Sequence, residues 1–376
     1  MSAWTQYSPT RIFFGVGEAR NISKHLAATG HTRVLLVADP FMVKSGIAQE
    51  VVDGSAGIIQ GVFHEVDPNP TVANVNGAVA AARRANADGI IALGGGSVLD
   101  ASKAAAAALG SGLTAEQLVT GSPVTGALPL IAVPTTAGTG SEVTPVAIIS
   151  WEERGIKFPL GSPLLYPQVA VVDPELVYSA PGKVIAASGI DVIDHCLDAL
   201  SSVKHTPLTD NNALNGARIA FANLEKAAND KDKEAINAMM LASLIAGLAF
   251  SQTGTTGSHA ASYYLTSRYH VPHGEATAFT EDAWFRINAR HRPEINELVA
   301  RIGFADADAV ADRLNEIKKS LGLRTTLEEL GIPLEDVDGL AQHTVDANNY
   351  GNNIAQLSKE EVKELFLTRS SARAGA

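Results

Sequence analysis

The sequence predicts a two-domain protein in which an α/β domain, built on a parallel and Rossmann-like sheet, precedes an all-helical domain. Up to about residue 180, short apolar runs alternate with alanine-rich amphipathic stretches, as in parallel sheets covered by helices. After Pro181 no strong strand run appears, and long alanine- and leucine-rich segments dominate. At 376 residues the chain also exceeds the usual size of one hydrophobic core. We therefore expect domains at residues 1–181 and 182–376.

The individual elements follow from the same patterns. Strands are expected where a run is apolar along nearly its whole length, since both faces of such a strand are buried. These runs cover residues 33–39, 89–93, 128–133 and 169–173. Helices are expected at 72–86 and 101–109, and in the second domain at 183–202, 211–229, 234–250, 294–302 and 307–321.

Composition and charge limit the classes of partner. The net charge of −11 disfavours a nucleic acid or an anionic membrane surface. The apolar run 238–250 is shorter than the ~20 residues that span a bilayer, so we expect a buried helix there. Residues 1–12 lack the basic start and apolar core of a signal peptide. The expectation is a cytoplasmic protein with a small-molecule partner and neither a nucleic-acid nor a membrane partner.

A glycine-rich turn follows the strand expected at 89–93. Gly94-Gly95-Gly96-Ser97 leads into a helix, where unpaired backbone N–H groups can bind a pyrophosphate and glycines allow its close approach. The spacing differs from the G-x-G-x-x-G fingerprint, so we expect a relative of the Rossmann domain and not a standard one. A strand–helix turn without a ligand is the alternative.

A second loop strengthens the dinucleotide interpretation. The segment from Pro134 to Glu142 follows the next buried strand and offers several hydroxyls and amides. Loops at the ends of neighbouring strands can bind the two halves of a dinucleotide. Asp39 ends an earlier strand, where a carboxylate can bind ribose hydroxyls and would repel a 2′-phosphate. This favours NAD(H) over NADP(H), although Asp39-Pro40 is also a plausible turn start.

Four residues of the second domain form a candidate metal site. Asp191 and His195 are four residues apart and would share one face of a helix. His259 and His273 form a second pair, with thirteen residues between them. One carboxylate and three imidazoles suit a divalent ion such as iron or zinc. For each residue alone the alternative is a structural role, and Cys196, beside His195, is interpreted as a packed thiol.

In their order along the chain, these motifs resemble those of the iron-containing (group III) alcohol dehydrogenases. The motifs are Gly94-Gly95-Gly96-Ser97-x-x-Asp100-x-x-Lys103, Pro134-Thr135-Thr136-x-Gly138-Thr139-Gly140-Ser141-Glu142, Asp191-x-x-x-His195, His259 and Pro272-His273-Gly274. The resemblance runs from about residue 8 to the C-terminus and is closest between residues 87 and 275. It implies a dehydroquinate synthase-like architecture, an active site in the cleft between the domains, and a homodimer.

The resemblance also implies roles for individual residues. By position, Asp191, His195, His259 and His273 match the family's metal ligands, which usually hold Fe²⁺ and sometimes Zn²⁺. The residues that match or border its cofactor site are Asn69, Gly95, Gly96, Ser97, Asp100, Thr135, Thr136, Thr139 and Lys157. The implied reaction is reversible hydride transfer between NAD(H) and a small aldehyde or primary alcohol, with the metal as Lewis acid.

Two stretches depart from the family pattern. Many members have a histidine, suspected of relaying protons, where this chain has Tyr263; a tyrosine is a poor relay because its ordinary pKa is about 10. Tyr263 and His270 are the candidates for the proton route, and a surface position in a turn is the alternative for His270. The segment 280–286 replaces a proline-containing apolar stretch, so we expect an atypical substrate pocket.

The substrate is the least defined part of the prediction. Residues 259–268 resemble a branch of the family associated with phosphonoacetaldehyde. Arg268 or Arg286 would bind such an anionic tail through charge-assisted hydrogen bonds, unless both face solvent. The alternatives on the same fold are a maleylacetate reductase and a lyase like dehydroquinate synthase, and a third is a catalytically inactive scaffold.

Overall fold

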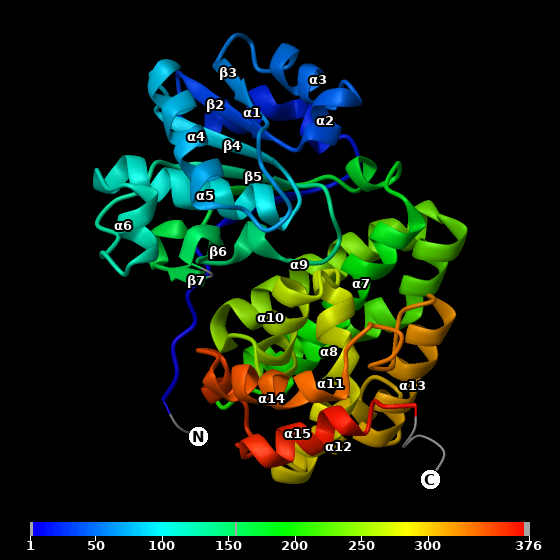
Figure 1. The fold of residues 1–376 in the computed structure, drawn as a ribbon. Helices are drawn as coiled ribbons and strands as arrows, with labels where there is room; N and C mark the ends of the chain where they lie inside the picture. The colour runs from blue at the N-terminus through cyan, green and yellow to red at the C-terminus, as the bar shows by residue number, and fades with distance from the viewer. Residues whose placement is uncertain (1–2, 155, 372–376) are drawn as a thin grey trace. The chain divides into compact units, whose positions relative to one another are not determined.

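The computed structural model describes residues 3–154 and 156–371. Their contacts divide the chain into two compact units, Tyr7–Tyr178 and Ser179 onward, and the short stretch before Tyr7 belongs to the second. In the described residues, the first unit combines strands and helices, whereas the second contains helices as its regular elements (Figure 1). The predicted fold class, an α/β part followed by an all-helical part, is confirmed.

A six-stranded parallel sheet forms the centre of the α/β unit. Its strand order is β1-β8-β5-β4-β2-β3. The strands are β1 (Arg11–Phe14), β2 (Val34–Ala38), β3 (Ile59–Phe63), β4 (Gly89–Gly94), β5 (Leu130–Pro134) and β8 (Val169–Val172). The four expected strands are β2, β4, β5 and β8, which lie inside the sheet and are buried throughout. The sequence did not predict β1 and β3, because at the edges exposed residues interrupt the apolar pattern.

Both faces of this sheet are covered, because alternate residues of a strand point to opposite sides. The helices of this unit are α1 (Ile22–Thr29), α2 (Pro40–Lys44), α3 (Ile47–Asp53), α4 (Val72–Arg84), α5 (Gly96–Ser111) and α6 (Ala115–Val119). Leu35 and Ile90 belong to the core on the side of α4 and α5, and Leu36 and Ile91 to the core on the side of α1 and α3. An antiparallel hairpin of β6 (Val146–Trp151) and β7 (Ile156–Gly161), which the sequence did not predict, completes the unit.

The helical unit follows. Its helices are α7 (Gly182–Leu200), α8 (Pro207–Glu225), α9 (Lys233–Thr253), α10 (Gly257–Arg268), α11 (His273–His291), α12 (Glu294–Ala300), α13 (Ala307–Ser320), α14 (Val337–Asp346) and α15 (Lys359–Leu367). The five expected helices correspond to α7, α8, α9, α12 and α13. Neither α10 nor α11 was predicted, because buried polar residues such as Ser258 and Thr277 interrupt the apolar stripe of each.

Helix α9 contains the apolar run that the sequence predicted to be buried. Among the described residues it is the helix that is long and apolar enough to cross a membrane, by length and composition only. In the structure it packs against α7 and α8. Met239 and Ala246 are among its fully buried side chains. It is therefore a core helix of this unit.

Candidate functional site

Helix α7 carries two of the candidate ligands on one buried face. Asp191 and His195 are one helical turn apart, and their side chains are 3% and 5% exposed. His195 Nδ1 lies 3.8 Å from Asp191 Oδ2. The helix holds both side chains in the interior because its C-terminal part, from Gly189 to Leu200, is buried along its whole length.

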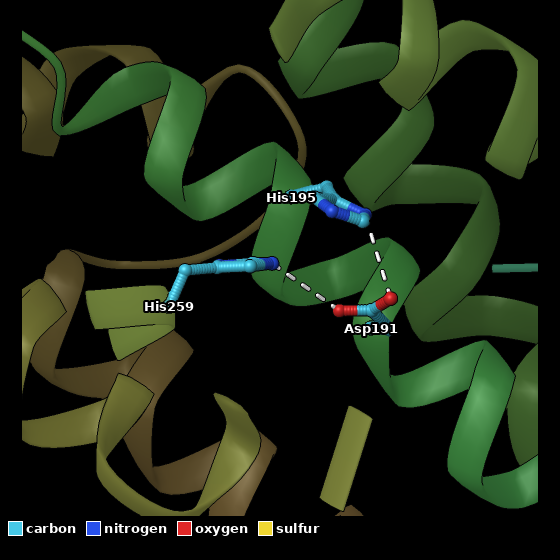
Figure 2. A group of neighbouring side chains, drawn as sticks. All are labelled: Asp191, His195 and His259. Carbon is cyan, nitrogen blue, oxygen red and sulfur yellow. Dashed lines mark ion pairs between the residues drawn. The ribbon is translucent and has the colours of Figure 1, made fainter. Parts of the chain in front are cut away.

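Helix α10 brings a third candidate ligand to the same point. His259 Nε2 lies 3.4 Å from Asp191 Oδ1, and ligand atoms of Asp191, His195 and His259 all lie within 4.8 Å of one another. Figure 2 shows these three side chains converging. His273, the first residue of α11, lies beside them, with its ring centroid 5.5 Å from that of His259. The structure thus brings the four predicted ligands together.

Asp198 holds His259 in place. Its carboxylate accepts hydrogen bonds from His259 Nδ1 at 2.7 Å, from Thr256 N at 2.8 Å and from the Ser258 hydroxyl at 3.1 Å. The Thr256 hydroxyl donates to it as well. Because a carboxylate can only accept, Nδ1 of His259 carries a proton, and Nε2 is the nitrogen that faces Asp191. Such a carboxylate–histidine pair commonly orients a metal-binding imidazole.

The environment of His259 Nε2 favours positive charge. This atom is buried and has no hydrogen-bond partner in the described part of the chain. Burial opposes a charged imidazole, but Asp198 and Asp191 outweigh it and raise the pKa of His259 to about 10. Burial alone would raise the pKa of Asp191, but His195, His273 and His259 hold it well below its usual range. Imidazole nitrogens beside an ionised carboxylate fit a divalent transition metal ion.

The Pro-His-Gly motif has a packing role at this site. A Cβ at Gly274 would lie 1.9 Å from the carbonyl oxygen of Ala187 and 2.9 Å from Asp191 Cβ, so α11 can approach α7 this closely only with glycine there. One turn later, the Thr277 hydroxyl donates to Asp194 Oδ2 at 2.7 Å and lies 3.3 Å from Asp191 Oδ1. Helix α11 therefore contributes both His273 and support for Asp191.

Sequence reasoning did not identify Asp198, Thr256 or Thr277. One signal was present for Asp198, which follows Asp191 by seven residues and therefore lies on the same face of α7 as both ligands. The hydrogen bonds of Thr256 and Thr277 join segments about sixty to eighty residues apart in the sequence, and no local pattern indicates them.

Cys196 belongs to the packing of α7. It is fully buried, and a Cβ at Gly216 of α8 would lie 2.8 Å from its Sγ. Burial raises the pKa of the thiol, and nearby Asp194 adds to the shift. These facts support the interpretation of Cys196 as a packed thiol and not a ligand.

The segment 280–286, where the sequence departs from the family pattern, lies inside α11. Burial, reinforced by Asp198 and Asp194, raises the pKa of Glu281 well above its ordinary value. Asp282 pairs with Lys318 at 2.6 Å and with Arg369 at 2.9 Å. These contacts give the segment a packing role within the helical unit, and an atypical substrate pocket stays a prediction.

The two candidates for the proton route differ in their surroundings. Tyr263 lies one turn after His259 on α10 and is half-buried. Burial raises its pKa to about 12, although a hydrogen bond with Thr255 opposes the shift. His270 is exposed and has a left-handed backbone with φ of 53°. The tyrosine therefore keeps its proton at neutral pH, and His270 occupies the surface turn that was its alternative interpretation.

The two candidate substrate arginines already have acidic partners. Arg268 Nε lies 2.9 Å from Asp336 Oδ2, and the arginine side chain is 56% exposed. Arg286 pairs with Asp308 at 2.5 Å and with Asp312 at 2.6 Å. An anionic substrate would have to compete with these carboxylates, and the role of both arginines stays a prediction.

The glycine turn and the threonine loop lie next to each other in the α/β unit. Gly94 of β4 pairs with Pro134 of β5, so the two loops leave the sheet at the same edge. A Cβ at Gly96 would lie 2.8 Å from Thr139 Cγ2. At Gly95 it would lie 3.3 Å from Thr136 Cγ2. The backbone N–H groups that begin α5 are therefore close to the hydroxyls of the threonine loop.

Three other predicted cofactor residues also lie together. Lys157 Nζ donates to Asn69 Oδ1 at 3.1 Å, and the backbone N–H of Asn69 donates to Ser97 Oγ at 3.3 Å. Burial lowers the pKa of Lys157.

Asp39 and Asp100, the two aspartates predicted to lie at the cofactor site, also make hydrogen bonds that stabilise the fold. Asp39 caps α2 by accepting from Phe41 N at 2.7 Å. Asp100 accepts from the Ser141 hydroxyl at 2.8 Å and from Ile148 N at 2.9 Å, so both of its oxygens have donors within the protein.

Two protein-family models match the chain. The model described as iron-containing alcohol dehydrogenase matches residues 9–174. The model for the C-terminal part of the Fe-containing alcohol dehydrogenase family matches residues 185–370. Together they cover both units of the structure.

Individual relatives agree with these models. The chain is 31% identical over 366 residues to "Alcohol dehydrogenase 4" of Saccharomyces cerevisiae (strain YJM789), covering 95% of this chain and 96% of the relative. It is 29% identical over 380 residues to the sulfoacetaldehyde reductase of Bilophila wadsworthia, covering 97% and 98%. The crystal structure of sulfoacetaldehyde reductase from Bifidobacterium kashiwanohense in complex with NAD⁺ has a TM-score of 0.92 and 36% identity, covering 99% and 100%.

Proposed function

Because the chain belongs to the iron-containing alcohol dehydrogenase family, we propose that it interconverts a small aldehyde and its primary alcohol with NAD(H) and one bound divalent metal ion. The observation that carries this proposal is the buried cluster of Asp191, His195 and His259, whose ligand atoms lie within 4.8 Å of one another. Fe²⁺ is the expected ion and Zn²⁺ the second choice, since carboxylate and imidazole ligands suit both.

Four side chains would hold the metal ion: Asp191, His195, His259 and His273. When bound, such an ion supplies Lewis-acid stabilisation of charge on a substrate oxygen. Asp198 keeps one proton of His259 on Nδ1, so Nε2 is the nitrogen that would bind the metal ion, in place of the second proton that the raised pKa of this imidazole favours. Thr277 fixes the position of α11 against Asp191 and Asp194. These contacts orient the ligands before a metal ion binds, which lowers the cost of ordering them.

The glycine turn and the threonine loop would bind the dinucleotide. Gly95, Gly96 and Ser97 offer N–H groups at the start of α5, where a helix N-terminus favours a pyrophosphate. Thr135, Thr136 and Thr139 would add hydroxyl and amide contacts. Asp39, at the end of β2, favours NAD(H) over NADP(H) because a carboxylate there repels a 2′-phosphate.

Tyr263 would act as a hydrogen-bond donor near the reacting oxygen. Its pKa of about 12 keeps the hydroxyl protonated at neutral pH. The tyrosine can therefore donate a hydrogen bond there but is a weak acid for proton transfer. The route from this hydroxyl to solvent, with His270 as a candidate, stays a prediction.

A short aldehyde with an anionic tail is the substrate class that we favour. Two relatives, at 36% and 29% identity, are sulfoacetaldehyde reductases, and phosphonoacetaldehyde has the same two-carbon aldehyde with a different anionic group. Arg268 and Arg286 stay candidates for binding this tail, in competition with their acidic partners. A plain alkyl aldehyde such as propanal is the second candidate, supported by the likeness to alcohol dehydrogenase 4. We also propose a cytoplasmic homodimer.

The test is NADH oxidation by metal-stripped protein that is resupplied with Fe²⁺ or Zn²⁺, using sulfoacetaldehyde, phosphonoacetaldehyde and propanal in parallel. We expect turnover only with metal and fastest with an anionic aldehyde. His259→Ala should abolish metal-dependent turnover, whereas His291→Ala, which removes an exposed histidine of the same unit, should not. Equal rates for propanal and the anionic aldehydes would remove the anionic proposal, and turnover without metal would contradict the metal-dependent reaction.

A further inference from the structure

Helix α5 contains a buried lysine that the proposed reaction leaves without a role. Lys103 is 1% exposed. Its ammonium group donates to Ser141 Oγ at 2.8 Å, to Thr144 Oγ1 at 3.0 Å and to the carbonyl oxygen of Val146 at 2.9 Å. An ammonium has three donors, so all of them are used. These contacts join α5 to the end of the threonine loop, at Ser141, and to the residues from there to the start of β6.

Asp100 completes the network from the preceding turn of α5. Its carboxylate accepts from the Ser141 hydroxyl at 2.8 Å. The Ser141 hydroxyl therefore accepts from Lys103 and donates to Asp100, and both of its partners come from one helix. Asp100 also accepts from Ile148 N at 2.9 Å, which fixes the start of β6. Helix α5 thus holds this segment at Ser141, Thr144, Val146 and Ile148.

Ser141, the first residue that α5 holds, also contacts Thr139 of the threonine loop. Thr139 Oγ1 accepts from Ser141 N at 3.3 Å. The Cγ2 atom of Thr139 lies 2.8 Å from where a Cβ at Gly96 would be. The separation between the glycine turn and the threonine loop therefore depends on where Ser141 is held, and Lys103 and Asp100 hold it.

We propose that Lys103 is a positioning residue for the dinucleotide, which keeps the threonine loop at the separation from the glycine turn that the pyrophosphate requires. This inference rests on the proposed function, in which NAD(H) binds between these two loops. Lys103 has no route to the cofactor itself, since its three donors are used and its side chain is buried.

A packing role alone would not require a charged group here. An apolar side chain of similar length would fill the same volume without the cost of burying an ammonium. Burial lowers the pKa of Lys103 to about 8, although Asp100 and Glu142 oppose the shift. At neutral pH the amine is therefore still protonated in most molecules. What the lysine adds is a fixed set of three hydrogen bonds.

The test uses the full-length, metal-loaded protein with Lys103→Met, which keeps most of the volume and removes the ammonium. We expect the Kd of NADH, measured by its fluorescence, and the KM for NADH to rise at least about tenfold. The turnover number at saturating NADH and the KM of the aldehyde should change by less than about threefold. Lys44→Met, which removes an exposed lysine of the same unit, is the matched control and should bind NADH like the wild type.

Two outcomes would overturn the inference. One is a folded Lys103→Met protein that binds NADH within about twofold of the wild type. The other is an equal loss in turnover with every substrate and no change in NADH affinity. If Lys103→Met does not fold, Ser141→Ala removes the shared hydroxyl, and unchanged NADH affinity in that variant counts against the inference. Wild-type protein that binds neither NADH nor NADPH would instead contradict the proposed function.

Discussion

Among single residues, Asp198 shows how the metal site depends on a side chain that is not itself a predicted ligand. Its carboxylate accepts from His259 Nδ1 and from two residues just before that histidine. The carboxylate therefore sets both the tautomer and the orientation of the imidazole. Asparagine has nearly the same shape, but its amide can donate to Nδ1 and so allow the wrong tautomer.

Asp198→Asn should weaken metal binding about 10- to 100-fold. Equilibrium dialysis against a competing chelator measures this directly. Asp338→Asn removes an equal charge from an exposed position on α14 and should leave metal affinity unchanged. Wild-type affinity in the Asp198→Asn protein would show that His259 is oriented by other contacts.

Tyr263 allows a prediction about pH. Burial raises its pKa from 10 to about 12, so the hydroxyl stays protonated on both sides of neutrality and does not titrate between about pH 6 and 9. Tyr263→Phe should lower turnover, by up to about tenfold for one lost hydrogen bond, without changing the shape of the pH–rate profile in that range. An alkaline limb that disappears in the variant would assign the titration to this tyrosine and contradict its pKa.

At the scale of elements, the contact between α7 and α11 is as important as the ligands that it brings together. Gly274 is the point of closest approach, because a Cβ there would overlap the carbonyl oxygen of Ala187. At Gly351, in the same unit, a Cβ would have nothing within 4 Å, and φ is negative. The two glycines therefore form a matched pair for substitution.

Gly274→Ala should push α11 away from α7, and with it His273 and Thr277. We expect a lower melting temperature, in line with the cost of overpacking of about 1–3 kcal/mol or more, and weaker metal binding. Gly351→Ala should change neither by a comparable amount. Scanning calorimetry with and without metal measures both effects, and equal melting temperatures for the two variants would refute the close approach.

Glu142, the last residue of the threonine loop, allows a second pH prediction. Burial raises the pKa of Glu142 to about 7, although Lys103 opposes the shift. The folded state then binds more protons than the unfolded state between about pH 4.5 and 7, so this group's contribution to stability is lost as the pH rises through that window. The loss is on the order of 3 kcal/mol at most.

Glu142→Gln removes this dependence. The melting temperature of the wild type relative to the variant should therefore fall from about pH 5 to about pH 7.5 and stay level above that. Parallel melting curves at the two pH values measure the difference. A wild-type advantage that grows with pH would mean that Glu142 is ionised in the folded protein throughout.

The elements also show what the sequence could predict. Strands β2, β4, β5 and β8 were found because both of their faces are buried, whereas the edge strands β1 and β3 carry exposed residues that hide the pattern. The four metal ligands were predicted because their spacing, and the short motifs that resemble the family, can be recognised directly in the sequence. The hydrogen bonds of Asp198, Thr277 and Lys103 could not be predicted, because each joins segments that only the folded chain brings together.

For the whole molecule, the two ligand sites belong to different compact units. The glycine turn and the threonine loop lie in the unit of Tyr7–Tyr178, and the metal cluster lies in the unit that starts at Ser179. A ligand that binds the folded state stabilises it by about 2.7 kcal/mol at a hundred times its Kd. Each ligand should therefore slow the hydrogen exchange of backbone amides mainly in the unit that binds it.

Hydrogen exchange followed by mass spectrometry can locate these patterns. Metal alone should slow exchange in α7, α10 and α11, and NADH alone should slow it at the start of α5 and in residues 134–142. Metal-dependent protection confined to the α/β unit would contradict the assignment of the metal site.

The single cysteine offers a practical advantage. Cys196 is fully buried against α8, and its thiol has a raised pKa, so the thiolate that maleimides and iodoacetamides require is scarce and shielded. Folded wild-type protein should resist such reagents without any replacement of its own cysteine. A cysteine placed on the surface of each unit could then carry a spin label or a fluorophore, and the pair would follow the distance between the two units in solution as NADH and metal are added.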